Sequence, residues 1–143
     1  MALGEKTVAK LVALVDGSAY TQSVCDHAAW VAQRTGAAVE LLHVLGRREV
    51  ASAPTNLSGN ITLGARTALL EELSTLDEQR AKLAQKRGRA ILDDAKAMLE
   101  ADGVAEVTTR LRIGDVVETV SEIEGEIDMV VVGNRGEASD FAK

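Results

Sequence analysis

The sequence has few of the residue types on which several functional classes depend. It contains one cysteine and one proline, and aromatic residues make up only 2% of its 143 positions. A single cysteine, Cys25, excludes an internal disulfide and is typical of a protein from a reducing compartment such as the cytoplasm. So few aromatic residues argue against modules that stack nucleic-acid bases. The core must therefore be built from Val, Leu, Ile and Ala.

The chain also lacks a basic surplus and a long apolar run. Its formal net charge is -6 and its pI is about 4.9, which argues against binding to a nucleic-acid backbone. The first six residues do not have the layout of a signal peptide. No stretch approaches the roughly 18 apolar residues of a membrane-spanning helix. We therefore expect a cytoplasmic globular protein with no nucleic-acid partner and no membrane span.

The fold prediction starts from one stretch near the end of the chain. Ile127–Val132 is apolar except at Asp128, which predicts a parallel strand covered on both faces. It ends at the turn Gly133-Asn134-Arg135-Gly136. Two glycines at this spacing let backbone N–H groups approach an anion. The alternative is a turn that needs glycine for its shape and binds nothing.

Three further strands and three helices are predicted from apolar runs and periodicity. The strands are Lys10–Val15, Ala37–Leu45 and Glu106–Ile113, and the helices are Tyr20–Arg34, Ala65–Ala101 and Val116–Ile123. This alternation predicts one α/β domain over residues 1–143, with an open parallel, Rossmann-like sheet and helices on both faces. Residues 46–64 contain the only proline and are expected to form a long mobile loop within the domain. A lid over a ligand is the alternative for this loop.

The longest predicted helix carries leucines on one face, namely Leu69, Leu73, Leu76 and Leu83. A coiled coil is not expected, because the heptads break down before four are complete. Thr75-Leu-Asp-Glu78 has the form of a capping box, which would end a short lead-in helix there. In the first helix, Cys25 is expected to pack in the core and His27 to lie on the surface.

The predicted crossovers place several candidate residues along one edge of the sheet, where ligands bind in open α/β folds. They are Asp16, Val44, Gly114 and Gly133. The carboxylate of Asp16 would accept a hydrogen bond from an adenine amine or a ribose hydroxyl, or would instead cap the following helix. The helix after Gly114 would hold a ligand at its amide end, or be capped by Asp115. No metal site is predicted, because His27 and His43 lack metal-ligand spacing.

Several motifs taken together resemble the universal stress protein family. They are Val15-Asp-Gly-Ser18, Leu42-His-Val44, Gly114-Asp115 and Val130-Val-Val-Gly-Asn-Arg-Gly136. The resemblance covers nearly the whole chain. It implies a five-stranded parallel fold of the adenine nucleotide alpha hydrolase-like type, a regulatory role in the stress response, and commonly a dimer.

The resemblance also implies a ligand. One branch of the family binds ATP through a pattern of Gly, two residues, Gly, nine residues, Gly, and then Ser or Thr. Gly133 and Gly136 match its first half and would contact phosphate. Asp16 matches a position that contacts adenosine, while Val44 and Val132 match apolar positions around the adenine. Further candidates in the same motifs are Val15, Gly17, Ser18, His43, Gly114, Asn134 and Arg135. The implied cofactor is ATP, with Mg²⁺ as its companion.

The second half of that pattern would run past Lys143, and the fifth strand, which helps to pair the subunits, is also missing. We expect a truncated chain, with divergence as the alternative, and a homodimer only where the full C-terminus is present. In either case the fourth strand would be left uncovered, without a fifth strand beside it.

Three functions compete. The first is a nucleotide-binding stress regulator. The second is a protein of the same family that binds no nucleotide and acts on an unknown protein partner. The third is an unrelated enzyme on the same fold, such as a nucleotidyl transferase. No catalytic residue is assigned, because the sequence has no Gly-x-x-x-x-Gly-Lys loop and places no base, so at most slow ATP hydrolysis is expected.

Overall fold

The computed structural model describes residues 9–47 and 63–133. Its strands form one parallel sheet in the order β3-β2-β1-β4. They are β1 (Lys10–Leu14), β2 (Ala38–Leu45), β3 (Val107–Ile113) and β4 (Met129–Val131). The helices are α1 (Thr21–Thr35), α3 (Leu63–Ala101) and α4 (Val116–Ile123), and a 3-10 turn, η1 (Glu124–Glu126), follows α4. The predicted open parallel α/β fold is confirmed.

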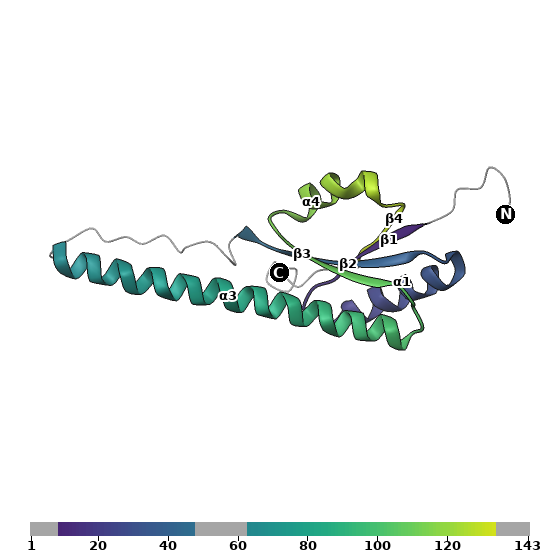
Figure 1. Ribbon diagram of the computed structural model, residues 1–143, viewed down its shortest axis with the longest axis horizontal. Helices are drawn as coiled ribbons and strands as arrows, with labels where there is room; N and C mark the ends of the chain where they lie inside the picture. Colours follow the sequence, from purple (N-terminus) through teal and green to yellow (C-terminus); the bar gives the residue numbers. More distant parts are fainter. Residues whose placement is uncertain (1–8, 48–62, 134–143) are drawn as a thin grey trace.

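The core has two layers, one on each face of the sheet. Helices α1 and α3 lie on one face and α4 lies on the other (Figure 1). The larger cluster, which includes Leu41, Leu92 and Leu99, fills the side of α1 and α3. The smaller cluster, formed by Val12, Leu42 and Ile123, fills the α4 side. Because neighbouring residues of a strand point to opposite faces, β2 supplies both layers, with Leu41 on one face and Leu42 on the other.

The first helix follows the sequence closely. Gly36 adopts a left-handed conformation with φ of 74°, and its N–H donates to the carbonyl of Ala32 at 2.8 Å. Gly36 is therefore the C-cap of this helix. Cys25 is fully buried and His27 is exposed, as predicted.

Helix α3 is continuous over 39 residues, so the predicted break near Thr75 is wrong. The hydroxyl of Thr75 donates to the carbonyl of Glu71 at 3.0 Å. It is thus satisfied one turn back within the same helix and caps no new helix. The residues that pack on the sheet begin at Gly88 and continue through Leu92 and Leu99.

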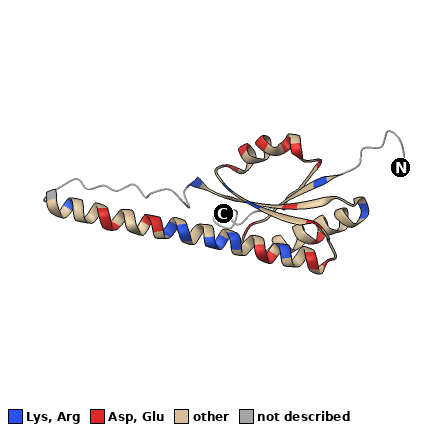
Figure 2. Ribbon diagram, viewed as in Figure 1, with Lys and Arg blue, Asp and Glu red and all other residues tan. Residues whose placement is uncertain are grey.

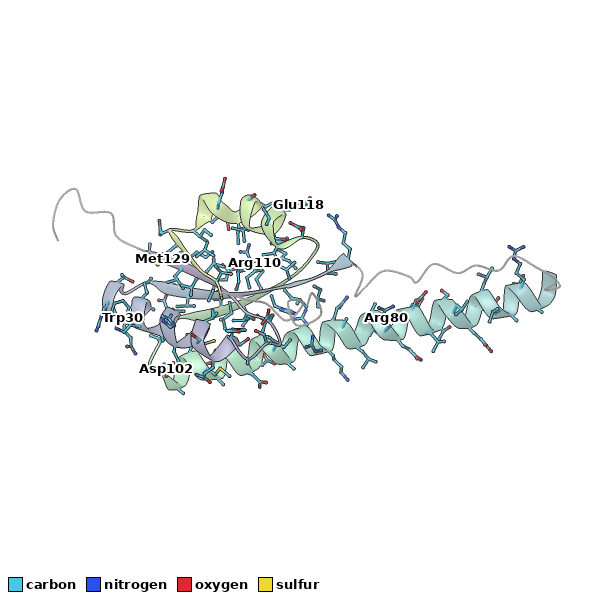
Figure 3. All side chains as sticks on the ribbon, turned by 180° about the vertical axis from the view of Figure 1, so that it is seen from behind. Trp30, Arg80, Asp102, Arg110, Glu118 and Met129 are labelled. Carbon is cyan, nitrogen blue, oxygen red and sulfur yellow. The ribbon has the colours of Figure 1, made fainter. Side chains whose placement is uncertain are left out.

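The part of α3 before Gly88 extends past the edge of the sheet (Figure 1). We call residues 63–87 the outer helix. Acidic and basic residues follow one another along it in separate stretches (Figure 2). Arg80 lies on this projecting part, in the half nearer the sheet, when the molecule is seen from behind (Figure 3).

The last strand differs from the prediction. It has only three residues, and within the described ranges it pairs with β1 alone. Met129 and Val130 are each 37% exposed, so the strand is not covered on both faces as its apolar run predicted. The physical reason is its place at the sheet edge, with one neighbouring strand instead of two. Among the described residues, the fourth strand is uncovered, as expected.

Asp128, the polar residue of that apolar run, has a structural role. Its Oδ2 accepts hydrogen bonds from the backbone N–H groups of Ala9 and Lys10 at 2.9 and 3.0 Å. The N–H of Asp128 in turn donates to the carbonyl of Lys10 at 2.9 Å. The side chain therefore closes the amino end of the β1–β4 pair, where the strand ladder leaves backbone donors without partners.

Glu40 is a buried carboxylate in β2. Glu40 is 5% exposed and is paired with Lys10 at 2.8 Å and with Arg110, which places a compensated charge on the α4 side of the sheet. Within residues 9–47 and 63–133, no helix is both long and apolar enough to cross a membrane. Most of the predicted loop, residues 48–62, lies outside the described residues.

Candidate functional site

Three neighbouring strands end at the same level of the sheet. Leu14 of β1 pairs with Leu42 of β2, so two residues further on Asp16 stands level with Val44. Ala13 pairs with Val131 of β4, so Val15 stands level with Gly133. The predicted meeting of Asp16, Val44 and Gly133 at the carboxyl edge therefore follows from the observed register.

This edge contains the topological switch point of the fold. From β1 the chain passes to β2 and then β3 on one side, whereas β4 lies on the other side of β1. The loops after β1 and β4 thus leave neighbouring strands, and the connections on the two sides run in opposite directions. A crevice at this point is the usual ligand site of open α/β sheets. Asp16 and Gly133 lie at this point of the sheet.

The carboxylate of Asp16 is held by its own turn. Its Oδ1 accepts a hydrogen bond from the N–H of Ser18 at 2.9 Å, and Thr21 donates its hydroxyl to the Asp16 carbonyl. Helix α1 begins after Tyr20, which makes no side-chain cap. Asp16 therefore shapes the turn before α1 and does not cap the helix. Its side chain is half-buried at the carboxyl edge.

The residues on either side of Asp16 have different surroundings. Val15 is buried and receives a hydrogen bond from His43, while Gly17 is exposed and Ser18 is half-buried. Ser18 Oγ accepts from the N–H of Tyr20 at 3.3 Å. Of the candidates in this turn, Asp16, Gly17 and Ser18 are reachable from solvent.

His43 lies in the core behind this turn. It is 4% exposed, and its Nδ1 lies 2.8 Å from the carbonyl oxygen of Val15. A carbonyl can only accept, so Nδ1 carries the proton. Gly88 of α3 passes close to the ring, because a Cβ built on it would lie 3.1 Å from His43 Cδ2. This location suits a residue that fixes the end of β1.

The two candidate valines differ in burial. Val44 is half-buried and packs beside the cluster of Val12, Leu42 and Ile123 on the α4 side. Val132 is 64% exposed, directly before Gly133. Both can present apolar surface at the edge. Asn134, Arg135 and Gly136 lie outside the described residues, so their predicted phosphate contacts stay a prediction.

The short helix α4 begins at the same edge with a capped end. Oδ1 of Asp115 accepts from the N–H of Glu118 at 3.0 Å, which is the capping alternative for this pair. Gly114 adopts φ of 144°, in the region that favours glycine, and its N–H donates to the carbonyl of Leu45 at 2.9 Å. Gly114 thus joins the ends of β2 and β3.

Arg47 is a basic residue at this edge that the sequence analysis missed. It follows β2, lies 3.9 Å from the Cβ position of Gly114, and pairs with Glu118 at 3.2 Å. Both side chains of the ion pair are largely exposed, so the pair is weak. The guanidinium of Arg47 is therefore available to an anion. Pairing of Leu45 with Ile113 brings Arg47 to α4, and no local pattern signals that pairing.

Two side chains away from the carboxyl edge of the sheet have a raised pKa. Burial, together with the nearby Asp26 and Asp102 carboxylates, raises the pKa of the Cys25 thiol to about 11. A hydrogen bond with Asp26, then desolvation and the repulsion between the two carboxylates, raises the pKa of Asp102. Neither group belongs to the strand ends, and an inert buried thiol agrees with the packing role predicted for Cys25.

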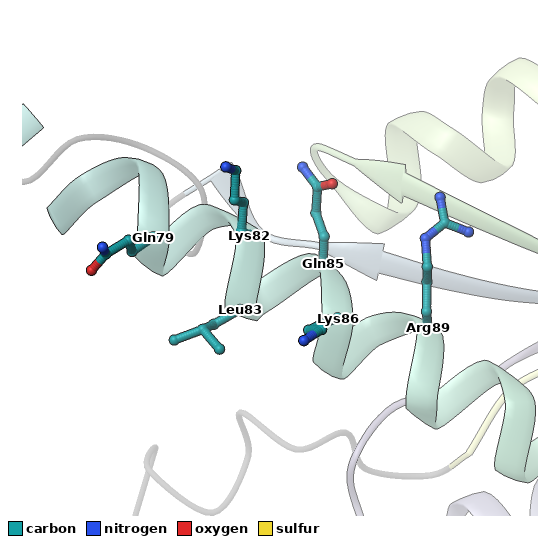
Figure 4. A pocket seen from close by; sticks show the side chains of 6 residues that line it. All are labelled: Gln79, Lys82, Leu83, Gln85, Lys86 and Arg89. Carbon is teal, nitrogen blue, oxygen red and sulfur yellow. The ribbon is translucent and has the colours of Figure 1, made fainter. Parts of the chain in front are cut away.

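The part of the chain that the structure describes has a surface hollow but no cluster of metal ligands. Within residues 9–47 and 63–133, no three His, Cys, Asp or Glu side chains gather as metal ligands. A surface hollow of about 590 Å³ lies on α3, and its described lining residues are shown in Figure 4: Gln79, Lys82, Leu83, Gln85, Lys86 and Arg89. It lies beside Gly88, the residue of α3 that approaches His43 of β2 and Leu111 of β3.

Fold and edge together define an open parallel α/β protein with its candidate site at the switch point. The chain belongs to the universal stress protein family, whose model matches residues 8–141. The universal stress protein Slr1230 of Synechocystis sp. is 33% identical over 129 residues, which cover 90% of this chain. The match covers 45% of Slr1230, so the chain spans about half the length of that relative.

Solved structures support the same fold. A universal stress protein in complex with cAMP matches with a TM-score of 0.57 and 18% identity, covering 96% of this chain and 84% of its own. The universal stress protein from Archaeoglobus fulgidus in complex with dAMP matches with a TM-score of 0.53 and 18% identity, covering 94% and 89%. At these identities the likeness establishes the fold alone.

Proposed function

We propose that this chain is a stress-response regulator that binds ATP or a related adenine nucleotide at the carboxyl edge of its sheet. The observation that carries the proposal is the switch point between β1 and β4, with Asp16 on one side and Gly133 on the other. Support also comes from two relatives of the same fold that were solved with cAMP and dAMP. The nucleotide would change the affinity of the protein for a partner or for a second copy.

Each residue at the edge has a role in this proposal. Asp16, held by the N–H of Ser18, accepts a hydrogen bond from a ribose hydroxyl or the adenine amine. Val44 and Val132 supply the apolar walls around the base. Gly133 would receive the phosphates, because a glycine lets a ligand approach the backbone without a side chain in the way. Arg47 stands at the same edge and adds a positive charge.

Mg²⁺ fits this site only as a companion of the nucleotide. The described residues bring no three ligand side chains together, so the ion would be held mainly by phosphate oxygens and water, as is usual for Mg²⁺. The sequence has no Gly-x-x-x-x-Gly-Lys loop, and no general base is assigned at the edge. We therefore assign binding and no catalytic residue, and hydrolysis of ATP would be slow at most.

The proposal is tested by what the protein carries when it is purified without added nucleotide. The protein is denatured and the released small molecules are identified by mass spectrometry. The proposal predicts an adenine nucleotide near one per chain. The same assay on Gly133→Val predicts loss of the nucleotide with an unchanged circular dichroism spectrum. Unchanged occupancy in that variant would contradict the site.

A protein that carries no nucleotide and takes up none on titration would favour the second function, a family member that acts through protein contacts alone. The specific observation behind that alternative is apolar surface left exposed on two elements. Met129 and Val130 are exposed on β4, and Leu76 and Leu83 are exposed on α3. Pairing of β4 with a strand of a second copy would be one route to the expected homodimer. We place the protein in the cytoplasm as part of the same proposal.

A further inference from the structure

The outer helix carries an apolar stripe that is exposed in the single chain. Leu76 is 59% exposed and Leu83 is 65% exposed. They are seven residues apart, which is two helical turns, so they lie on the same face. Leu69 and Leu73 continue the stripe at spacings of three and four and are half-buried. Two leucines this exposed on one face of a helix suit a helical partner.

Charge is divided along the same helix. Residues 71–78 contain four acidic residues and no basic one, whereas residues 79–90 contain five basic residues and no acidic one. Figure 2 shows the two stretches one after the other on α3. A second copy of the helix running antiparallel would lay each acidic stretch against a basic one. A parallel copy would lay like charges side by side, which is unfavourable.

We propose that two copies of this chain associate through their outer helices, antiparallel, about a two-fold axis near Gln79. Glu72 and Lys86 are each seven residues from Gln79, so Glu72 of one copy faces Lys86 of the other, twice per dimer. Leu76 and Leu83 also lie on opposite sides of the axis. They therefore pack across it, and both copies bury the same stripe, as a two-fold interface requires.

The hollow on α3 lies on the surface that this pairing uses. Gln79, Leu83 and Lys86 are among its lining residues (Figure 4). Side chains of a second helix can enter the space between side-chain rows of the first, as in ridges-into-grooves packing. The hollow therefore offers space for the side chains of a second helix.

The interface is short, which sets its strength. From Leu69 to Arg87 the helix rises about 27 Å, at ~1.5 Å per residue. This is under three heptads, so the pair is not an extended coiled coil, in agreement with the sequence analysis. We expect a reversible dimer with a dissociation constant on the order of micromolar to tens of micromolar.

Sedimentation velocity over a range of concentrations tests the proposal with matched charge variants. Glu72→Lys and Lys86→Glu each replace two attractive contacts by two repulsive ones, so each should raise the dissociation constant about tenfold. The double variant Glu72→Lys/Lys86→Glu restores both pairs and should return the constant toward that of the wild type. Glu71→Lys is the control, because it makes the same charge change one residue away on the far side of the helix.

The proposal is overturned if the chain stays monomeric up to several hundred micromolar. It is also overturned if Glu71→Lys and Glu72→Lys raise the dissociation constant equally. A double variant that dimerises more weakly than either single variant would overturn it as well. Finally, Leu76→Glu/Leu83→Glu must give a monomer. These leucines are exposed in the single chain, so its circular dichroism and melting profile should match the wild type, and a dimer that persists would place the interface elsewhere.

Discussion

Nδ1 of His43 donates a hydrogen bond of 2.8 Å to the carbonyl of Val15, the residue directly before Asp16. This contact ties the carboxyl end of β1 to β2 on the side covered by α3. Nε2 of the same ring is buried and has no hydrogen-bond partner among the described residues. The candidate site therefore rests on a packed imidazole, and its shape depends on how closely α3 approaches.

Gly88 sets that approach. A Cβ at this position would lie 2.9 Å from Leu111 Cδ1 and 3.1 Å from His43 Cδ2, so Gly88→Ala pushes α3 away from the sheet. We expect a loss of about 1–3 kcal/mol in the free energy of unfolding, measured by chemical denaturation. Gly64→Ala is the matched control in the same helix, since nothing lies within 4 Å of its Cβ position. It should be neutral or slightly stabilising, and equal effects of the two substitutions would contradict the packing argument.

Asp128→Ala removes the acceptor of two backbone hydrogen bonds at the start of β1. The expected cost is about 1–2 kcal/mol in the free energy of unfolding. Asp128→Asn keeps an oxygen at the same place and should cost less. Denaturation curves of the two variants make the comparison, and an alanine variant as stable as the wild type would show that these bonds contribute nothing.

Cys25 should be inert in the folded protein. With its pKa raised to about 11, roughly one thiol in a thousand is ionised at pH 8, and the side chain is fully buried. Ellman's reagent should therefore react with Cys25 only at the rate of unfolding in native buffer, and at once in guanidinium chloride. Rapid reaction of the native protein would mean that the layer between α1 and α3 opens readily.

Asp102 gives the protein a defined pH dependence. Its pKa is raised above the ordinary value of 3.8, so the folded state holds this proton more tightly than the unfolded state does. The resulting stabilisation is present below the ordinary pKa and is lost as pH rises through the raised one. Asp102→Asn stays neutral at every pH. Its melting temperature should exceed that of the wild type at pH 7, and the difference should shrink toward pH 4. A constant difference across this range would contradict the coupling to Asp26.

The elements predicted from the sequence were those whose signals are local. Helix α4 was found with its observed bounds, because Gly114-Asp115 marks its start and its own apolar spacing marks its length. The run at Ile127–Val132 showed that a strand was present. The burial of that strand depends on how many strands lie beside it, and the apolar run alone does not reveal this number. Met129 and Val130 of β4 proved to be exposed.

In the candidate site, too, residues with a local sequence signal were predicted, and residues that depend on strand pairing were missed. Asp16 and Gly133 could be placed at the carboxyl edge because each directly follows an apolar run. Arg47 was missed, since it reaches Gly114 and Glu118 only through the pairing of β2 with β3. The role of Gly88 was missed for a similar reason, because its partners His43 and Leu111 come from two different strands.

The most direct test of the central claim is a calorimetric titration of nucleotide-free protein with ATP and Mg²⁺, beside the same titration of Asp16→Ala. The account predicts one site per chain in the wild type and a loss of affinity of at least tenfold in the variant. Loss of a hydrogen bond between a carboxylate and the nucleotide would produce a decrease of this size. Equal affinities in the two proteins, or no heat of binding in the wild type, would contradict the assignment of the β1–β4 switch point as a nucleotide site.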